Sequence, residues 1–141
     1  RSGGANGADS AFEAGCTHKE IYLPWPGFNG RQSEFQAVCD KALTLAATIH
    51  PRWDRLGRAA RNLMGRNCYQ VLGRDLSNPV DFVLCWTPDG VEDEQSRTQA
   101  TGGTGQAIAL ASRHGIPVFN LARGDALVRL RGFLEIEKAP Q

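Results

Sequence analysis

Apolar residues follow two spacings along the chain, one typical of buried strands and one typical of helices. Short, nearly all-apolar runs at residues 20–23, 81–86 and 116–121 predict strands, because a strand covered on both faces needs apolar side chains at successive positions. Apolar residues at helical spacing predict helices elsewhere. These helices cover residues 8–15, 32–49, 53–72 with an interruption near Gly65, 106–113 and 125–134. Strands that alternate with helices indicate an α/β fold, a three-layer sandwich around a mainly parallel sheet.

Two glycine-rich loops open predicted helices, SGGANGAD at residues 2–9 and TGGTG at residues 101–105. Glycine has no Cβ, so the backbone can adopt positive φ and a ligand can approach closely. The start of a helix also presents unpaired N–H groups and a positive dipole end, which suit an anion such as phosphate. The loops therefore predict a nucleotide-type site, although a plain tight turn also explains the first. The candidate ligand-binding residues are Ser2, Gly3, Gly4, Gly7, Gly102, Gly103, Thr104, Gly105 and Gln106.

Four residues outside these loops are further candidates. Arg66 and Asn67 follow a helix-breaking glycine and precede a new apolar run, so we expect them to point into a cleft. Thr87 and Asp89 lie in a turn after strand 81–86, at the strand end where open α/β sheets place ligands. We expect Asp89 to face a sugar or a base.

Asp9 and Asp89 are the acid/base candidates near the two loops, and each also has a simpler explanation. The helix dipole accounts for Asp9 in the first turn of a helix, and turn initiation accounts for Asp89. The chain contains no nucleophile elbow and no serine–histidine–aspartate set. The sequence therefore contains no residue pattern that requires a catalytic function.

Two polar loops could cover the predicted site. Residues 24–31, PWPGFNGR, carry Trp25 and Phe28, which form either a lid that stacks on a base or a packed turn. Residues 91–100 are polar, charged and without period, which indicates a mobile loop or an ordered lid.

Composition narrows the classes of partner. At 141 residues the chain is long enough for one α/β domain with its own core. Its net charge of +1 is too small to attract nucleic acid through the overall charge of the protein. The arginines of residues 52–66 form its most basic part, mostly explained by a solvated helix face. Without a run of 18 apolar residues or a signal-peptide pattern, we expect a soluble, cytoplasmic protein with no membrane partner.

The cysteines and the start of the chain give two more expectations. Four cysteines without a CxxC pair, in apolar surroundings, indicate reduced, buried thiols, and we expect neither a metal site nor a cofactor.

The chain enters a glycine loop directly after Arg1, although such a loop normally follows a strand. We therefore expect a first strand upstream of residue 1 or supplied by a partner.

Neither loop carries a common nucleotide-binding motif. Neither GGxxG at residues 3–7 nor GGTG at residues 102–105 is the dinucleotide motif GxGxxG, and the strand at residues 20–23 ends without an acidic residue for a ribose. GxxxxGK[ST] is absent as well. NAD oxidoreductases and P-loop NTPases are therefore disfavoured.

The segments SGGANGAD, DFVLCWTPDG and GGTGQAIALASRHGIPVFNL together resemble the SLOG superfamily across almost the whole chain. That superfamily includes the DNA-processing protein DprA and the Lonely Guy phosphoribohydrolases. The likeness is closest to its small DprA-like or YspA-like members from phages and mobile elements. The resemblance implies a Rossmann-like sheet that binds a nucleotide-derived ligand between the two loops, and it favours a homodimer.

The chain departs from the Lonely Guy motif PGGxGTxxE at three positions. Thr101 and Gln106 replace the proline and the threonine, and Ala109 stands where those enzymes carry a catalytic glutamate. An apolar side chain cannot act as acid or base. Our leading hypothesis is therefore nucleotide binding. The alternatives are an N-glycoside or phosphoribosyl hydrolase using Asp9 or Asp89, and a single-stranded DNA-binding accessory protein.

Overall fold

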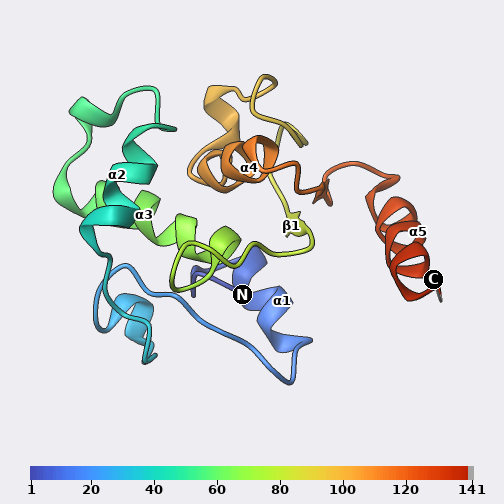
Figure 1. Cartoon of the computed structure of the whole chain (residues 1–141), viewed down its shortest axis with the longest axis horizontal. Coiled ribbons are helices and arrows are strands. Elements are labelled where there is room, and N and C mark those ends of the chain that lie inside the picture. The colour runs from blue at the N-terminus through green and yellow to red at the C-terminus, as the bar shows by residue number, and fades with distance from the viewer. Residues whose placement is uncertain (140–141) are drawn as a thin grey trace. The chain divides into compact units, whose positions relative to one another are not determined.

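The computed structural model describes residues 1–139, and the chain divides between Val80 and Asp81 into two compact units, called here unit 1 and unit 2. Figure 1 shows the whole chain coloured from one end to the other. The described residues form five α-helices and one two-stranded parallel sheet, so the protein is mixed α/β. No helix within residues 1–139 combines the length and the apolar character needed to cross a membrane.

Unit 1 is built from helices and two isolated parallel bridges. Its elements are α1 (Ala8–Ala14), α2 (Asp40–Ala47) and α3 (Arg58–Leu72), with short 3-10 turns at Phe28–Gly30 and Trp53–Arg55. The first bridge joins Ser2 to Ile21 and the second joins Tyr22 to Phe35. Predicted strand 20–23 therefore forms bridges only. The ring of Tyr22 stacks on both Phe35, at 4.7 Å, and Tyr69, at 5.5 Å, which centres the core of this unit.

The predicted helix over residues 32–49 is wrong in its first half, since α2 begins only at Asp40. The preceding residues run extended because their polar groups have non-helical partners. The backbone N–H of Leu23 donates to the carbonyl of Phe35 at 2.8 Å, and the N–H of Phe35 donates to Ser33 Oγ at 3.1 Å. The apolar side chains Phe35 and Val38 still pack on the core, but from an extended segment.

The predicted interruption at Gly65 is also wrong, because α3 runs unbroken from Arg58 to Leu72. Gly65 lies where α3 approaches its neighbours closely: a Cβ on this residue would stand 2.5 Å from Val38 Cγ1 and 3.2 Å from Leu43 Cδ2. The missing side chain therefore permits close packing of α3, which Figure 1 shows beside α2.

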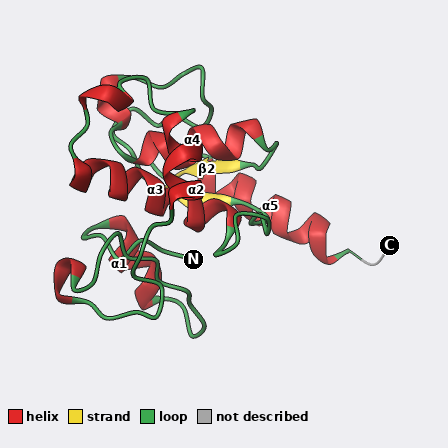
Figure 2. Cartoon of the chain, turned by 60° about the vertical axis from the view of Figure 1, so that its left-hand side comes forward, coloured by secondary structure: helices red, strands yellow, loops and turns green. Residues whose placement is uncertain are grey.

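Unit 2 is a β-α-β arrangement followed by a helix. β1 (Val83–Cys85) pairs in parallel with β2 (Val118–Asn120), in a register that places Cys85 opposite Asn120. Between them lie the 3-10 turn Gln99–Thr101 and α4 (Thr104–Arg113), and α5 (Ala126–Lys138) follows β2. Figure 2 shows the two strands side by side in yellow. Because the strands are parallel, the connecting helix α4 begins at the edge of the sheet where β1 ends.

The predicted elements of unit 2 are largely confirmed. Both strands are shorter than their apolar runs, and α4 begins two residues before its predicted start. Ile108 to Ala111 of α4 are buried as its core face, and Phe82, Phe119 and Phe133 pack their rings within 6.2 Å of one another. The prediction of a mixed α/β fold with a parallel sheet is therefore confirmed in this unit.

Candidate functional site

The first glycine loop, residues 2–7, encloses a carboxylate of its own chain. Asp9 Oδ2 accepts hydrogen bonds from the backbone N–H groups of Gly3 and Ala5, each at 3.2 Å. Gly3 is one of the residues that the sequence predicted to bind a phosphate, and Ala5 lies in the same loop. The Asp9 side chain therefore occupies the position of the anion, and its placement is explained by two loop amides as well as by the helix dipole.

Other residues of unit 1 hold the rest of this loop. Ser2 Oγ donates to the buried carboxylate of Glu13 at 2.6 Å, and Asn29 Nδ2 donates to the Gly4 carbonyl at 3.1 Å. Ser2, Gly3 and Gly4 are buried, whereas Gly7 is exposed with φ of 91° before α1, a helix of seven residues. The first loop is thus a packed structural turn, the alternative that the sequence left open.

Arg66 and Asn67 lie in the interior of unit 1, with 6% and 7% of their surface exposed, not in an open cleft as expected. The Arg66 guanidinium donates to the carbonyls of Gly3 and, at 3.4 Å, Tyr22, and its Nε donates to Asn67 Oδ1 at 3.0 Å. Burial lowers the pKa of Arg66, while the negative charge of Asp9 raises it. Arg66 therefore holds the first loop in place from the interior of unit 1, through its hydrogen bond to the Gly3 carbonyl.

The aromatic loop at residues 24–31 is a packed turn. The rings of Trp25 and Phe28 meet edge to face at 5.2 Å, and the Arg66 guanidinium lies 5.6 Å from the Phe28 ring centre. Arg31 forms an ion pair with Glu13, which joins this turn to α1. A hollow of about 650 Å³ lies nearby, but none of the predicted site residues line it. Its walls are Pro26, Gly27, Gln32, Ser33, Glu34 and Gln36.

The second glycine loop is more open. Gly102 and Gly103 are exposed, Thr104 is half-buried, and the ten-residue helix α4 follows directly. Gly102 has φ of 64°, which favours glycine, whereas Gly103 has φ of −62° and already has helical geometry. Gly105 is buried, and a Cβ there would stand 3.2 Å from the Cδ of Arg97. Gln106, another candidate, is buried on α4 with 3% of its surface exposed.

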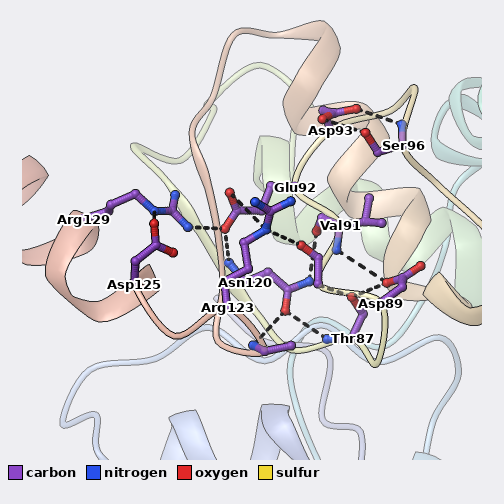
Figure 3. A network of polar contacts seen from close by, with 12 residues as sticks. Thr87, Asp89, Val91, Glu92, Asp93, Ser96, Asn120, Arg123, Asp125 and Arg129 are labelled. Atoms are coloured by element: carbon purple, nitrogen blue, oxygen red, sulfur yellow. Dashed lines mark hydrogen bonds and ion pairs between the residues drawn. The ribbon is translucent and has the colours of Figure 1, made fainter.

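Asp89 holds the segment that leads into this loop, as Figure 3 shows in part. Its carboxylate accepts hydrogen bonds from the hydroxyl groups of Thr87 at 2.8 Å, Thr98 at 2.7 Å and Thr101. The Thr101 hydroxyl, the largest cause, and those of Thr98 and Thr87 lower the pKa of Asp89 to about 2. The carboxylate is therefore ionised at neutral pH and is a weak base, because an effective general base has a pKa near the working pH. Asp89 therefore holds the loop through these hydroxyl groups, and the expectation that it faces a sugar or a base stays a prediction.

Asn120 and Glu92 complete the network, and sequence reasoning missed both. Asn120 is fully buried, and its Nδ2 donates to Thr87 Oγ1 at 2.6 Å and to the Val91 carbonyl at 2.9 Å (Figure 3). Its backbone N–H donates to Glu92 Oε1 at 2.9 Å, and this oxygen also accepts from Arg129 at 2.6 Å. The available signal was a polar residue near the end of the apolar run at residues 116–121.

The polar segment at residues 91–100 is ordered by ion pairs. Glu94 receives hydrogen bonds from Arg113 Nη2 at 2.6 Å and Nε at 2.9 Å, and it lies 3.5 Å from Arg97. The Arg113 guanidinium lowers the pKa of Glu94. Arg97, which was not among the predicted site residues, lies with its stem beside Gly105, while its guanidinium group faces Glu94.

The cysteines match the sequence analysis only in part. All four are free thiols, but Cys16 and Cys39 are exposed, so only Cys68 and Cys85 are buried as expected. Burial raises the pKa of both Cys68 and Cys85 to about 12, which keeps these thiols protonated.

Comparison with protein-family models, curated proteins and solved structures finds no match for this chain. The assignment of a function therefore depends on the geometry of the two loops.

Proposed function

We propose that this protein binds a nucleotide or a related phosphorylated small molecule, and that the second glycine loop holds the phosphate. The observation that carries the proposal is the exposed pair Gly102–Gly103 at the start of a ten-residue helix. The start of α4 presents a positive dipole end to an anion, and Gly102 and Gly103 place no side chain in the way, while the N–H groups of Gly102 and Gly105 donate within the turn to the carbonyls of Gln99 and Gly102.

Side chains around the second loop suit the same ligand. The Thr104 hydroxyl is half-buried at the first position of α4 and can donate a hydrogen bond to a phosphate oxygen. Arg97 lies beside Gly105 with its stem, and its guanidinium group, paired with Glu94, adds a positive charge near the loop. Asp89 contributes by holding Thr98 and Thr101, so that the loop is ordered before a ligand arrives.

The motif resemblance supports a wider proposal. We propose a SLOG-type, Rossmann-like protein with a three-layer arrangement of its sheet and helices, cytoplasmic and homodimeric. Binding without turnover is the form that the site favours, because both candidate acids are engaged: Asp9 by two backbone N–H groups and Asp89 by three hydroxyl groups.

Single-stranded nucleic acid is a second candidate ligand, supported by one surface feature. Arg52, Arg55 and Arg58 are exposed, and the Arg61 guanidinium lies 5.4 Å from the ring centre of Trp53. Arginine side chains of this kind neutralise backbone phosphates, and such binding weakens steeply with salt. A steep loss of DNA affinity between 50 and about 200 mM salt would support this candidate.

Calorimetric titration with AMP, ribose 5-phosphate and inorganic phosphate tests the leading proposal. The informative variant is Gly103→Asp, because Gly103 has a helical backbone conformation that every residue type adopts, and the new carboxylate repels a phosphate. Gly132→Asp in α5 is the matched control, since it adds the same charge where a Cβ meets nothing within 4 Å. We expect Gly103→Asp to abolish binding and Gly132→Asp to preserve it. Equal affinities of both variants and the unmodified protein would contradict the proposal.

A further inference from the structure

Trp86 differs from the other tryptophans in what surrounds its ring. The ring of Trp25 packs on Phe28, and that of Trp53 lies under the Arg61 guanidinium. Trp86 keeps 52% of its surface exposed, and none of the ring or cation contacts found within residues 1–139 involves it. Exposing a side chain this large and apolar has a cost, and an open aromatic ring is a suitable surface for a flat ligand.

The topology of unit 2 places Trp86 at the same sheet edge as the second glycine loop. Trp86 is the first residue after β1, so it lies at the carboxyl end of that strand. Helix α4 joins the parallel strands β1 and β2, so its N-terminus lies at this edge as well. Within the connection from β1 to α4, the hydrogen bond from Thr101 to Asp89 joins the segment just after Trp86 to the segment just before Gly102. Ligands of open α/β sheets bind at this edge.

The backbone around Trp86 is anchored on both sides. The carbonyl of Cys85 accepts a hydrogen bond from the N–H of Leu121 at 2.8 Å, and the N–H of Thr87 donates to Asn120 Oδ1 at 3.2 Å. Thr87 itself is 1% exposed. The tryptophan therefore projects from a fixed segment, so little backbone freedom is lost when a ligand stacks on its ring.

We propose that Trp86 is a stacking platform for a nucleobase, so that the ligand class is a base-bearing nucleotide and not a sugar phosphate alone. This inference rests on the proposed function, because the second glycine loop would hold the phosphate of the same molecule. Stacking on an aromatic ring accepts every base, since each base has a π-face. The inference therefore predicts a preference for nucleotides over ribose 5-phosphate with little choice among bases.

The test compares AMP with ribose 5-phosphate by calorimetric titration of the full chain. Trp86→Ala is expected to weaken AMP binding by about 5- to 150-fold, the range that base–aromatic stacking supplies, and to leave ribose 5-phosphate unchanged. Trp86→Phe should retain most of the AMP affinity. Leu127→Ala is the matched control, because Leu127 is also 52% exposed and lies on α5 of the same unit. AMP should also quench tryptophan fluorescence in the unmodified protein, and Trp86→Phe should remove that quenching.

The outcomes separate this inference from the proposed function. If ribose 5-phosphate binds and AMP binds no better, the loop proposal survives and the stacking inference is overturned. An unchanged AMP affinity in Trp86→Ala overturns the inference in the same way. If AMP, ribose 5-phosphate and inorganic phosphate all fail to bind the unmodified protein, both the proposed function and the inference are wrong.

Discussion

In the first glycine loop, the amides of Gly3 and Ala5 donate to the Asp9 carboxylate, whereas in the second loop Gly102 and Gly103 are exposed at the start of α4. Both loops are glycine-rich and both precede helices. They differ in that Asp9, two residues past Gly7, closes the first loop. At the second loop, the Asp89 carboxylate accepts hydrogen bonds from the hydroxyl groups of Thr98 and Thr101. The comparison shows that similar glycine-rich motifs fold differently: the first loop encloses a carboxylate of its own chain, whereas the second keeps two exposed glycines at a helix start.

The largest expected effect is a loss of unfolding free energy when Arg66, the buried cation that contacts the first loop, is replaced. Arg66→Leu removes the donor to the Gly3 and Tyr22 carbonyls and leaves Asp9 without its neighbouring charge, at a cost of about 3 kcal/mol in unfolding free energy. Urea denaturation measures this loss. Arg58→Leu on the same helix is the control, because Arg58 is exposed and should change stability by less than about 0.5 kcal/mol. Similar small losses in both variants would show that the first loop does not depend on Arg66.

A smaller effect on stability is expected from Asp9→Ala, which leaves the two loop amides without their acceptor. The expected cost is about 1 to 3 kcal/mol, with ligand affinity unchanged, since Asp9 belongs to the structural loop. The control is Asp40→Ala, because Asp40 is an exposed acid in the first turn of α2 and should cost only about 0.3 to 1 kcal/mol. A loss of nucleotide binding in Asp9→Ala, with the fold retained, would indicate that the first loop and not the second holds the phosphate.

Thr104→Val tests the second loop through a single hydroxyl group. The substitution keeps the shape of the side chain and removes a donor to the phosphate, so affinity for AMP should fall by about tenfold, as expected for one hydrogen bond to a charged group. Unfolding free energy should stay within about 0.5 kcal/mol of the unmodified protein. Unchanged affinity would indicate that Thr104 does not contact the ligand.

The smallest expected effect is a pH dependence of the unfolding free energy that comes from Asp89. It is detected as the difference between the unmodified protein and Asp89→Asn. The folded state lowers the pKa of Asp89 from 3.8 to about 2, so it favours the ionised form. The stability contributed by this carboxylate is therefore complete above about pH 4 and is lost as pH falls towards 2. The difference in unfolding free energy between the unmodified protein and Asp89→Asn should shrink across that interval. A difference that stays constant from neutral pH down to 2 would contradict the threonine hydrogen bonds assigned to Asp89.

The fold was predictable from the sequence where local pattern and tertiary packing agree. The apolar run at residues 116–121 and the helix after the second glycine loop are such cases, and β2 and α4 lie there. Residues 32–39 have helical spacing too, but Ser33 and Phe35 form hydrogen bonds with the segment at residues 21–23. Gly65 was misinterpreted because a glycine required by close helix packing looks the same in sequence as one that ends a helix.

For the candidate site, the sequence indicated which segments to inspect but not the roles of their residues. The turn with Thr87 and Asp89 and the second loop do lie in contact, through the Asp89–Thr101 hydrogen bond, and their ligand-binding role stays a prediction. Asp9 shows the limit: the sequence indicates an acid near a helix start, but only the folded loop shows that its carboxylate reaches the amides of Gly3 and Ala5. Asn120 was missed because its function is to pair with groups that are far away in sequence, 33 residues from Thr87.

The most direct test of the comparison follows the backbone amides of both loops by NMR while inorganic phosphate and then AMP are added to the ¹⁵N-labelled protein. Our account predicts saturable shifts at Gly102, Gly103, Thr104 and Gly105, with the amides of Gly3 and Ala5 unmoved because Asp9 keeps them occupied. Shifts confined to Gly3, Gly4 and Ala5 would contradict it, since they would show that the ligand displaces Asp9 and that the first loop is the anion site.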